Sequence, residues 1–249
     1  MNCRVVLVRT EVAANIGATA RVMRNFGLDQ LILVGPAADP RDLHARALAT
    51  HGEDILDRCR VVSDFAEAVG ACALVAATSA RTGGLFRRQT VGPPHEILPI
   101  LARAQTSGPV ALVFGPERTG LTNEEVSRCT YLVNIPTVPE CPALNLAQAV
   151  AICLYEMSRS VIPGSGAEVS EDVAPYAEQE RMFSTLRESL ERIEYLYGPK
   201  ADALMHGLRH LIGRARPSRM EVGLLTGLAR QIDWVASRRS EASDRRASD

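Results

Sequence analysis

Short apolar runs alternate with amphipathic segments along the first part of the chain. The apolar runs are rich in Val, Leu and Ile and are bounded by polar or glycine-containing turns, which is typical of buried strands. They predict strands over residues 3–8, 31–34, 60–62, 74–78, 110–114 and 131–135. Segments with apolar positions three and four residues apart predict helices over residues 19–26, 41–50, 64–69, 94–104, 122–129 and 146–160.

Strands that alternate with helices indicate an α/β fold, in which helices flank a mostly parallel sheet. The pattern changes after residue 160, where Pro, Gly, Ser and acidic residues occur without periodicity and only helical patterns follow. We therefore predict a first domain, a linker, a small α-helical C-terminal extension and a flexible tail. Their bounds are 1–160, 161–174, 175–238 and 239–249, with helices at 175–197, 202–212 and 218–236.

Composition supports a globular protein but gives little direct evidence of a partner. Hydrophobic residues make up 46% of the 249 residues and aromatic residues only 4%, so bases are not expected to stack on an aromatic platform. The formal net charge is −1. Any nucleic-acid site must therefore be a local basic patch rather than a property of the whole surface.

The cysteine and histidine patterns argue against metal binding. No Cys-x-x-Cys pair occurs among the six cysteines, and we predict buried, reduced thiols in a cytoplasmic protein. His206 and His210 lie four residues apart on a predicted helix, but the Glu of a metalloprotease motif is absent. A partly exposed helix face is the favoured interpretation. We therefore predict no metal. We also predict no membrane span, because no apolar run is long enough to cross a bilayer.

The most specific local pattern follows the apolar run at 110–114. Gly115 and Gly120 frame a loop, and Thr122 with Glu125 then has the spacing of a capping box at the start of a helix. The loop matches neither the dinucleotide-binding fingerprint nor a P-loop. Gly115 would let a flat or anionic ligand come close to the backbone.

This loop is one of three that follow predicted strands. Thr78 to Ala80 follow the strand at 74–78, and residues 135–144 follow the strand at 131–135. Ligands of open α/β sheets bind beyond the carboxyl ends of the strands, so the three loops could form one site. The alternative is that they are ordinary turns, because every strand ends in one.

Two further motifs accompany the glycine loop. Asn15-x-Gly17-x-x-Ala20-Arg21 lies upstream, and a Pro- and Asn-containing block from Ile135 to Asn145 lies downstream. In this order and spacing, the three blocks resemble the SpoU/TrmH branch of the SPOUT RNA methyltransferases. Within that branch, the TrmJ-like tRNA 2′-O-ribose methyltransferases are the most similar. The resemblance covers residues 1–160 well and extends loosely to residue 217.

The resemblance implies a deep trefoil knot at the end of the first domain, a homodimer, and S-adenosyl-L-methionine as methyl donor. The implied substrate is tRNA, methylated at the start of the anticodon loop. Ribosomal RNA is the alternative substrate, and an RNA-binding paralogue with weakened activity is the alternative function. The residues implied to bind the cofactor are Thr78, Ser79, Ala80, Gly115, Ile135, Pro142, Ala143 and Leu144.

The resemblance also implies catalytic roles for Arg21, Asn15, Glu117 and Asn145. Arg21 would face the target ribose and phosphate next to the partner subunit's cofactor. Arginine is too weak a base at neutral pH, so we expect it to orient the nucleophile and hold phosphate. For each residue a simpler role is open: a solvated helix arginine, helix caps, or a loop acid that binds nearby amides.

Two features modify this interpretation. Related proteins usually carry Ser-Leu-Asn where this chain has Ala143-Leu144-Asn145, so one hydroxyl is missing beside the expected site. The extension carries a local excess of positive charge, which could bind RNA phosphates or only form a solvated helix face. The basic residues in question are Lys200, Arg209, Arg214, Arg216 and Arg219.

Overall fold

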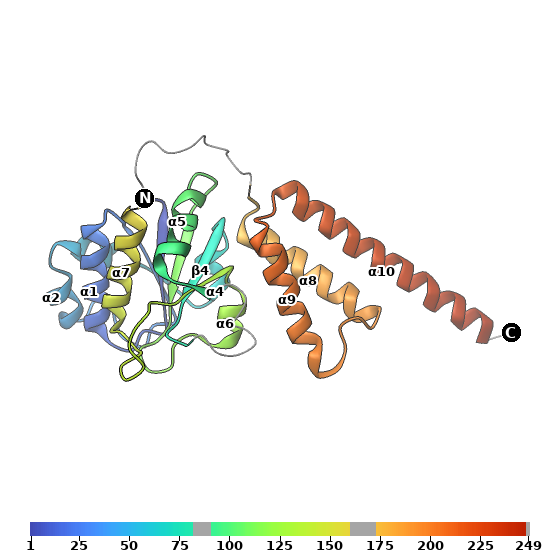
Figure 1. Ribbon diagram of the computed structural model, residues 1–249, viewed down its shortest axis with the longest axis horizontal. Coiled ribbons are helices and arrows are strands. Elements are labelled where there is room, and N and C mark those ends of the chain that lie inside the picture. Colours follow the sequence, from blue (N-terminus) through green and yellow to red (C-terminus); the bar gives the residue numbers. More distant parts are fainter. Residues whose placement is uncertain (82–90, 160–172, 248–249) are drawn as a thin grey trace. The chain divides into compact units, whose positions relative to one another are not determined.

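The computed structural model describes residues 1–81, 91–159 and 173–247, with side chains described as far as Arg238. Contacts divide the chain into two compact units, Met1–Glu171 and Asp172–Asp249 (Figure 1). Most of the predicted linker at 161–174 lies outside the described residues; within it, Val173 forms a single antiparallel bridge to Ser218.

Within the described residues, the first unit is built on a seven-stranded sheet in which every strand pair is parallel. The strand order is β3-β2-β1-β6-β4-β7-β5. The predicted α/β fold with a parallel sheet is confirmed. The strands are β1 (Cys3–Val8), β2 (Gln30–Val34), β3 (Arg60–Val62), β4 (Leu74–Thr78), β5 (Val91–Gly92), β6 (Val110–Phe114) and β7 (Tyr131–Val133).

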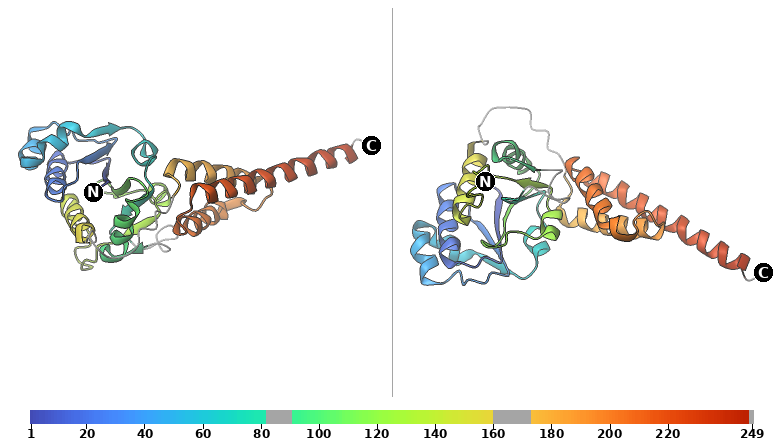
Figure 2. Two further views of the ribbon diagram at one scale, coloured as in Figure 1. Left: turned by 90° about the horizontal axis from the view of Figure 1, so that it is seen from above. Right: turned by 60° about the horizontal axis from the view of Figure 1, so that its bottom comes forward.

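In the described part of this unit, helices and one 3-10 turn connect the strands. Helix α7 contacts both α1 and α5, and these helices cover one face of the sheet (Figures 1 and 2). Helix α4 contacts β2 and β3. The elements are α1 (Ala13–Asn25), α2 (Leu43–Ala49), η1 (Thr50–Gly52), α3 (Glu53–Arg58), α4 (Phe65–Val69), α5 (Pro94–Ala104), α6 (Asn123–Ser127) and α7 (Leu146–Arg159).

The core lies on both faces of the sheet because the strands are apolar at successive positions. Cys3, Val5 and Leu7 face a cluster that includes residues of α1, α5 and α7. The intervening residues Val6 and Val8 are also buried. Side chains alternate between faces along a strand, so both faces exclude water. This explains why uninterrupted apolar runs predicted the long strands correctly.

Helix α1 begins six residues before the predicted start at residue 19, as α1 spans Ala13–Asn25. The prediction was wrong because Asn15 and Gly17 resemble turn residues. Tertiary packing explains the helix here: a Cβ at Gly17 would lie 1.9 Å from the carbonyl oxygen of Ala45 in α2. Glycine therefore permits close approach of two helices, at a known cost in helix propensity.

The second unit consists of three helices and a short 3-10 turn in the described residues: α8 (Tyr176–Arg192), η2 (Gly198–Lys200), α9 (Ala201–Arg214) and α10 (Arg219–Ala247). Helix α8 packs along α10, and α10 projects beyond it (Figure 2). A small core forms around Met182, Phe183 and Met205. The backbone of α10 is helical to Ala247, so the segment predicted as a flexible tail is largely helical.

His206 and His210 are buried, with 3% and 5% of their surface exposed, so the prediction that they lie on a partly exposed helix face was wrong. Their rings lie edge to face on α9, with centroids 4.1 Å apart. Burial, and then the positive charges of His206, Arg214 and Arg209, lower the pKa of His210 to about 4. At neutral pH His210 is therefore an uncharged core residue.

Candidate functional site

A cavity of about 190 Å³ opens at the carboxyl ends of β4, β6 and β7. Parallel strands place their carboxyl ends at one edge of the sheet, so the loops that follow them meet there. The cavity is lined by all eight residues that the sequence suggested for cofactor binding. These are Thr78, Ser79, Ala80, Gly115, Ile135, Pro142, Ala143 and Leu144.

The loop after β4 is fixed by hydrogen bonds to both neighbouring strands. The Thr78 hydroxyl donates to the carbonyl of Val113 at 3.2 Å, and the Ser79 amide donates to that of Val133 at 3.0 Å. Asn134 Nδ2 donates to the Ser79 carbonyl at 2.9 Å. Asn134 was missed by the sequence analysis because its role depends on the pairing of β4 with β7.

The loop after β6 closes on itself. A Cβ at Gly115 would lie 2.3 Å from the Leu121 amide nitrogen. The Gly120 amide donates to the Pro116 carbonyl at 2.9 Å, and Gly120 has a positive φ of 67°. Gly115 is therefore required first by the loop itself. This differs from the expected reason, the close approach of a ligand to its backbone.

The third wall runs from β7 to α7. Asn145 caps α7, because its Oδ1 accepts a hydrogen bond from the Ala147 amide at 2.9 Å. Thr137 Oγ1 donates to the carbonyl of Pro142 at 3.0 Å, which closes the loop 137–142 on itself. The predicted cap is confirmed, and it fixes the position of the preceding Leu144 in the wall.

A chain of side-chain hydrogen bonds joins the three sequence motifs. Asn145 Nδ2 donates to Asn15 Oδ1 at 2.8 Å, and Asn15 Nδ2 donates to Glu117 Oε1 at 2.7 Å. The Glu11 amide donates to the other Glu117 oxygen at 3.0 Å. Residues 15, 117 and 145 are far apart in sequence, so this chain brings together three of the four residues with implied catalytic roles.

Arg21 is the fourth of these residues, and it lies elsewhere. It is exposed on α1 and does not line the cavity. Among the described residues, no acidic group lies within ion-pair distance of it. Its guanidinium is therefore available to a ligand or to another subunit rather than committed to a contact within its own chain.

Two arginines that the sequence analysis did not select do line the cavity. Arg81 and Arg118 are exposed there, and the described residues provide neither with an ion-pair partner. Their positions in sequence could have identified them, because Arg118 lies inside the Gly115–Gly120 loop and Arg81 directly follows Ala80. Two guanidinium groups therefore belong to the cavity lining, together with the carboxylate of Glu117.

Two of the five basic residues suggested in the extension, Arg209 and Arg219, have acidic partners. Arg209 forms a two-pronged ion pair with Glu180 and stacks over Phe183, 4.6 Å from its ring centroid, so its guanidinium is held within the domain. Arg219 pairs with Glu178 at 3.0 Å. Lys200 and Arg214 are exposed, and no acidic partner occurs for them among the described residues. Arg216 lies in the turn between α9 and α10, with a φ of 53°.

All six cysteines are free thiols, but not all are buried as predicted. Cys59 is half-buried and Cys141 is exposed. Burial raises the pKa of Cys153 to about 12. Within the described residues, no group of His, Cys, Asp and Glu could hold a metal ion. In the same residues, no helix is both long enough and apolar enough to span a membrane.

Comparison with known proteins matches both units. The profile of the SpoU rRNA methylase family matches residues 2–155, and that of the C-terminal domain of the tRNA methyltransferase TrmJ matches residues 177–245. The chain is 38% identical over 238 residues to the tRNA (cytidine/uridine-2′-O-)-methyltransferase TrmJ of Yersinia enterocolitica. That alignment covers 93% of this chain and 91% of the relative.

A relative from Pseudomonas aeruginosa, the tRNA (cytidine/uridine/adenosine-2′-O-)-methyltransferase TrmJ, is also 38% identical, over 94% of both chains. Among solved structures, TrmJ from Zymomonas mobilis superimposes with a TM-score of 0.78 at 33% identity, covering 92% of this chain and 98% of that one. The resemblance inferred from the three motifs is therefore confirmed: the chain belongs to the SpoU methylase family and carries the C-terminal domain of the TrmJ group.

Proposed function

We propose that this chain transfers the methyl group of S-adenosyl-L-methionine to a ribose 2′-OH of tRNA, at the start of the anticodon loop. The observation that carries the proposal is the cavity at the strand ends, which is lined by all eight residues implied to bind the cofactor. The experiment is transfer of a labelled methyl group to tRNA transcribed in vitro, with ribosomal RNA as the comparison.

The cavity suits the methyl donor. Ile135, Leu121 and Leu144 give it apolar walls, which an adenine ring needs, and the loop backbones offer hydrogen-bonding groups. The donor carries a positive sulfonium, and Glu117 adds a carboxylate to the lining. When bound, S-adenosyl-L-methionine supplies an electrophilic methyl carbon. The chain's own contribution is to position the donor and the attacking hydroxyl.

The hydrogen-bond chain gives each polar residue a defined role in this proposal. Glu117 fixes the amide of Asn15, and Asn145 completes the chain while it caps α7. The hydrogen bonds therefore fix the orientations of the three side chains beside the cavity. Arg21 would orient the target ribose and its phosphate, because a guanidinium group is too weak a base to take the proton of the attacking hydroxyl.

We further propose a homodimer, a knotted first domain and a cytoplasmic location. The homodimer is supported by Arg21, which does not line the cavity of its own chain. The knot is supported by β7, which pairs between β4 and β5 before the chain passes into α7 between α1 and α5. The cytoplasmic location is supported by the free thiols.

RNA phosphates are the ligands that Arg81 and Arg118 fit best. Neither arginine has an ion-pair partner among the described residues, and a phosphate next to the target ribose would attract both more strongly than a cofactor that is net positive and carries a single carboxylate. In the extension, Lys200 and Arg214 are the candidates for further phosphate contacts. They lie at opposite ends of α9, and Arg216 and Arg219 follow the end that carries Arg214. Arg209 is better explained as a structural residue, because Glu180 and Phe183 hold it.

Arg118→Gln should weaken tRNA binding and reduce its salt dependence. Each lost phosphate contact lowers the slope of log K against log salt concentration by roughly 0.7–0.9. Arg118→Lys should keep the slope, because it keeps the charge. Arg103→Gln is the matched control, since Arg103 is exposed on α5 and does not line the cavity. Equal slopes for Arg118→Gln and the wild type would show that Arg118 makes no contact with RNA phosphates.

Ala143→Ser should change turnover only modestly. The serine usual in related proteins would add one neutral hydrogen bond, worth about 0.5–1.5 kcal/mol, or roughly threefold to tenfold in rate. Single-turnover methyl transfer at saturating tRNA and cofactor measures this. An inert wild type together with a robustly active Ala143→Ser variant would favour the alternative, an RNA-binding paralogue with weakened activity. This alternative is supported by Ala143, which lines the cavity without the hydroxyl that the usual serine would provide.

A further inference from the structure

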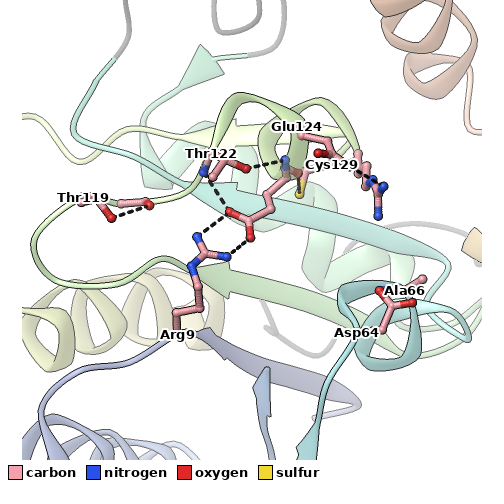
Figure 3. A network of polar contacts seen from close by, with 10 residues as sticks. Arg9, Asp64, Ala66, Thr119, Thr122, Glu124 and Cys129 are labelled. Carbon is pink, nitrogen blue, oxygen red and sulfur yellow. Dashed lines mark hydrogen bonds and ion pairs between the residues drawn. The ribbon is translucent and has the colours of Figure 1, made fainter. Parts of the chain in front are cut away.

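A two-pronged ion pair joins the end of β1 to the first turn of α6. Arg9 Nη1 donates to Glu125 Oε1, and Arg9 Nη2 donates to Glu125 Oε2 at 3.0 Å (Figure 3). The two residues are 116 positions apart in sequence. The Glu125 side chain is only 13% exposed, whereas that of Arg9 is 43% exposed. Glu125 is thus largely removed from water and depends on its partners.

Glu125 also fixes the end of the loop that forms one wall of the cavity. The Thr122 amide donates to Glu125 Oε2 at 2.8 Å, and the Glu125 amide donates to Thr122 Oγ1 at 3.2 Å, which completes a capping box (Figure 3). Thr122 directly follows Leu121, a cavity residue whose amide lies against Gly115. One carboxylate therefore receives both Arg9 and the backbone at the end of the loop.

The start of the same loop is bound to the same region of the chain. Glu117 accepts hydrogen bonds from the Glu11 amide at 3.0 Å and from Asn15 Nδ2 at 2.7 Å. The loop after β6 is thus held at two places, through Glu117 and Glu125, by the segment Arg9–Asn15. That segment also begins α1, which carries Arg21.

The segment itself is firmly anchored. Arg9 has a positive φ of 49°, which is rare for a residue with a side chain, and its amide donates to the Val34 carbonyl at 2.8 Å. The Thr10 carbonyl accepts from the amides of Ala37 and Ala38 at 3.0 and 3.1 Å. Arg9 is therefore fixed by the ends of β1 and β2 and presents its guanidinium from a rigid base.

The charge of Glu125 is maintained at neutral pH. Burial would raise the pKa of Glu125, but the hydrogen bonds from Arg9 and Thr122 outweigh burial and hold the pKa below its usual value. Without Arg9, Glu125 would keep its capping contacts but would be a partly buried charge without a counter-charge. Such a group moves toward water, and the end of the loop would move with it.

We propose that Arg9 is a positioning residue for the cofactor cavity: through Glu125 it sets the end of the loop after β6, in register with the segment that leads to Asn15 and Arg21. This inference rests on the proposed function. Its consequence is specific. Loss of Arg9 weakens cofactor binding, although Arg9 does not line the cavity.

The same helix provides a matched control. Arg128, the residue that directly follows α6, pairs with Glu124 in its first turn at 2.6 Å, with side chains 35% and 75% exposed. Neither residue lines the cavity. Arg128→Met thus removes an arginine–glutamate pair from α6 without touching the anchored loop. Exposed pairs of this kind contribute little to stability.

The test compares Arg9→Met, Arg9→Lys, Glu125→Gln and Arg128→Met in the full chain. Affinity for S-adenosylhomocysteine is measured by isothermal titration calorimetry, and melting temperature is measured without ligand. Gln can replace Glu in a capping box, so Glu125→Gln removes the charge and keeps the cap. We expect Arg9→Met and Glu125→Gln each to weaken binding about tenfold, Arg9→Lys to weaken it less, and Arg128→Met to leave it unchanged.

The double variant Arg9→Met/Glu125→Gln should bind no more weakly than either single variant, because both remove one interaction. Wild-type affinity in Arg9→Met would overturn the inference. So would equal losses in Arg9→Met and Arg128→Met, since that result would indicate a general effect of α6 stability. A wild type that binds no S-adenosylhomocysteine would instead overturn the proposed function, so the two failures are distinguishable.

Discussion

Gly115→Val should abolish cofactor binding. A Cβ at this position would lie 2.3 Å from the Leu121 amide and 2.5 Å from the Gly120 carbonyl carbon, so both ends of the cavity loop would have to separate. In the wild type, ligand at 100 times its dissociation constant stabilises the native state by about 2.7 kcal/mol. For a protein of this size that corresponds to a rise in melting temperature of roughly 5–10 °C.

Differential scanning fluorimetry with S-adenosylhomocysteine measures this rise, and Gly115→Val should show none. Gly207→Val is the matched control, because a Cβ at Gly207 meets nothing within 4 Å and the residue lies in α9. The control should keep the full ligand-dependent rise. A Gly115→Val protein that folds and still responds to ligand would show that the cofactor does not use this loop.

Arg21→Ala should abolish turnover, and pairing this variant with a Gly115→Val chain in one dimer should restore part of it. Arg21 is exposed and outside the cavity of its own chain, so we expect it to act at the partner's cavity. Loss of a charge that binds the reacting ribose-phosphate unit should lower turnover by about 100-fold or more. Gly115→Val should be equally inactive, because it does not bind the cofactor.

A heterodimer of Arg21→Ala and Gly115→Val contains one site with an intact cavity and an intact arginine. Co-expression with two affinity tags isolates it, and its turnover should be about half that of the wild-type dimer, because one of two sites works. Arg24→Ala serves as the control for an exposed arginine on the same helix, where Arg24 pairs with Asp54 at 3.5 Å. Failure of the heterodimer to recover activity, or an active monomer by sedimentation, would contradict the shared site.

The parallel sheet could be predicted from the sequence because its strands are buried on both faces. Runs such as Val110–Phe114 contain no polar positions, so they are distinct from amphipathic segments. The elements missed were those without such a pattern. β5 has only two residues, and α3 only six. The early start of α1 depends on the packing of Gly17 against Ala45, which is a tertiary contact that no local pattern encodes.

The meeting of the three loops could be anticipated because loops that follow parallel strands reach one edge of a sheet, whereas the individual lining residues were implied by the family resemblance. The hydrogen bonds between those loops could not be predicted. Asn15, Glu117 and Asn145 have separate local roles in sequence, and only the fold joins them. Arg209 was expected to bind RNA because it lies in a basic stretch. Its contacts with Glu180 and Phe183 come from the neighbouring helix α8, so they were invisible in the sequence.

Methyl transfer to tRNA is the measurement that tests the account most directly. The purified chain would be incubated with unmodified tRNA and S-adenosylmethionine carrying a deuterated methyl group. The anticodon-loop fragment would then be isolated after nuclease cleavage of the tRNA, and its nucleosides analysed by mass spectrometry. We expect deuterated 2′-O-methyl nucleosides from the anticodon-loop fragment with the wild-type chain, and none with Gly115→Val. Label found on a base, only in ribosomal RNA, or in no RNA at all would contradict it.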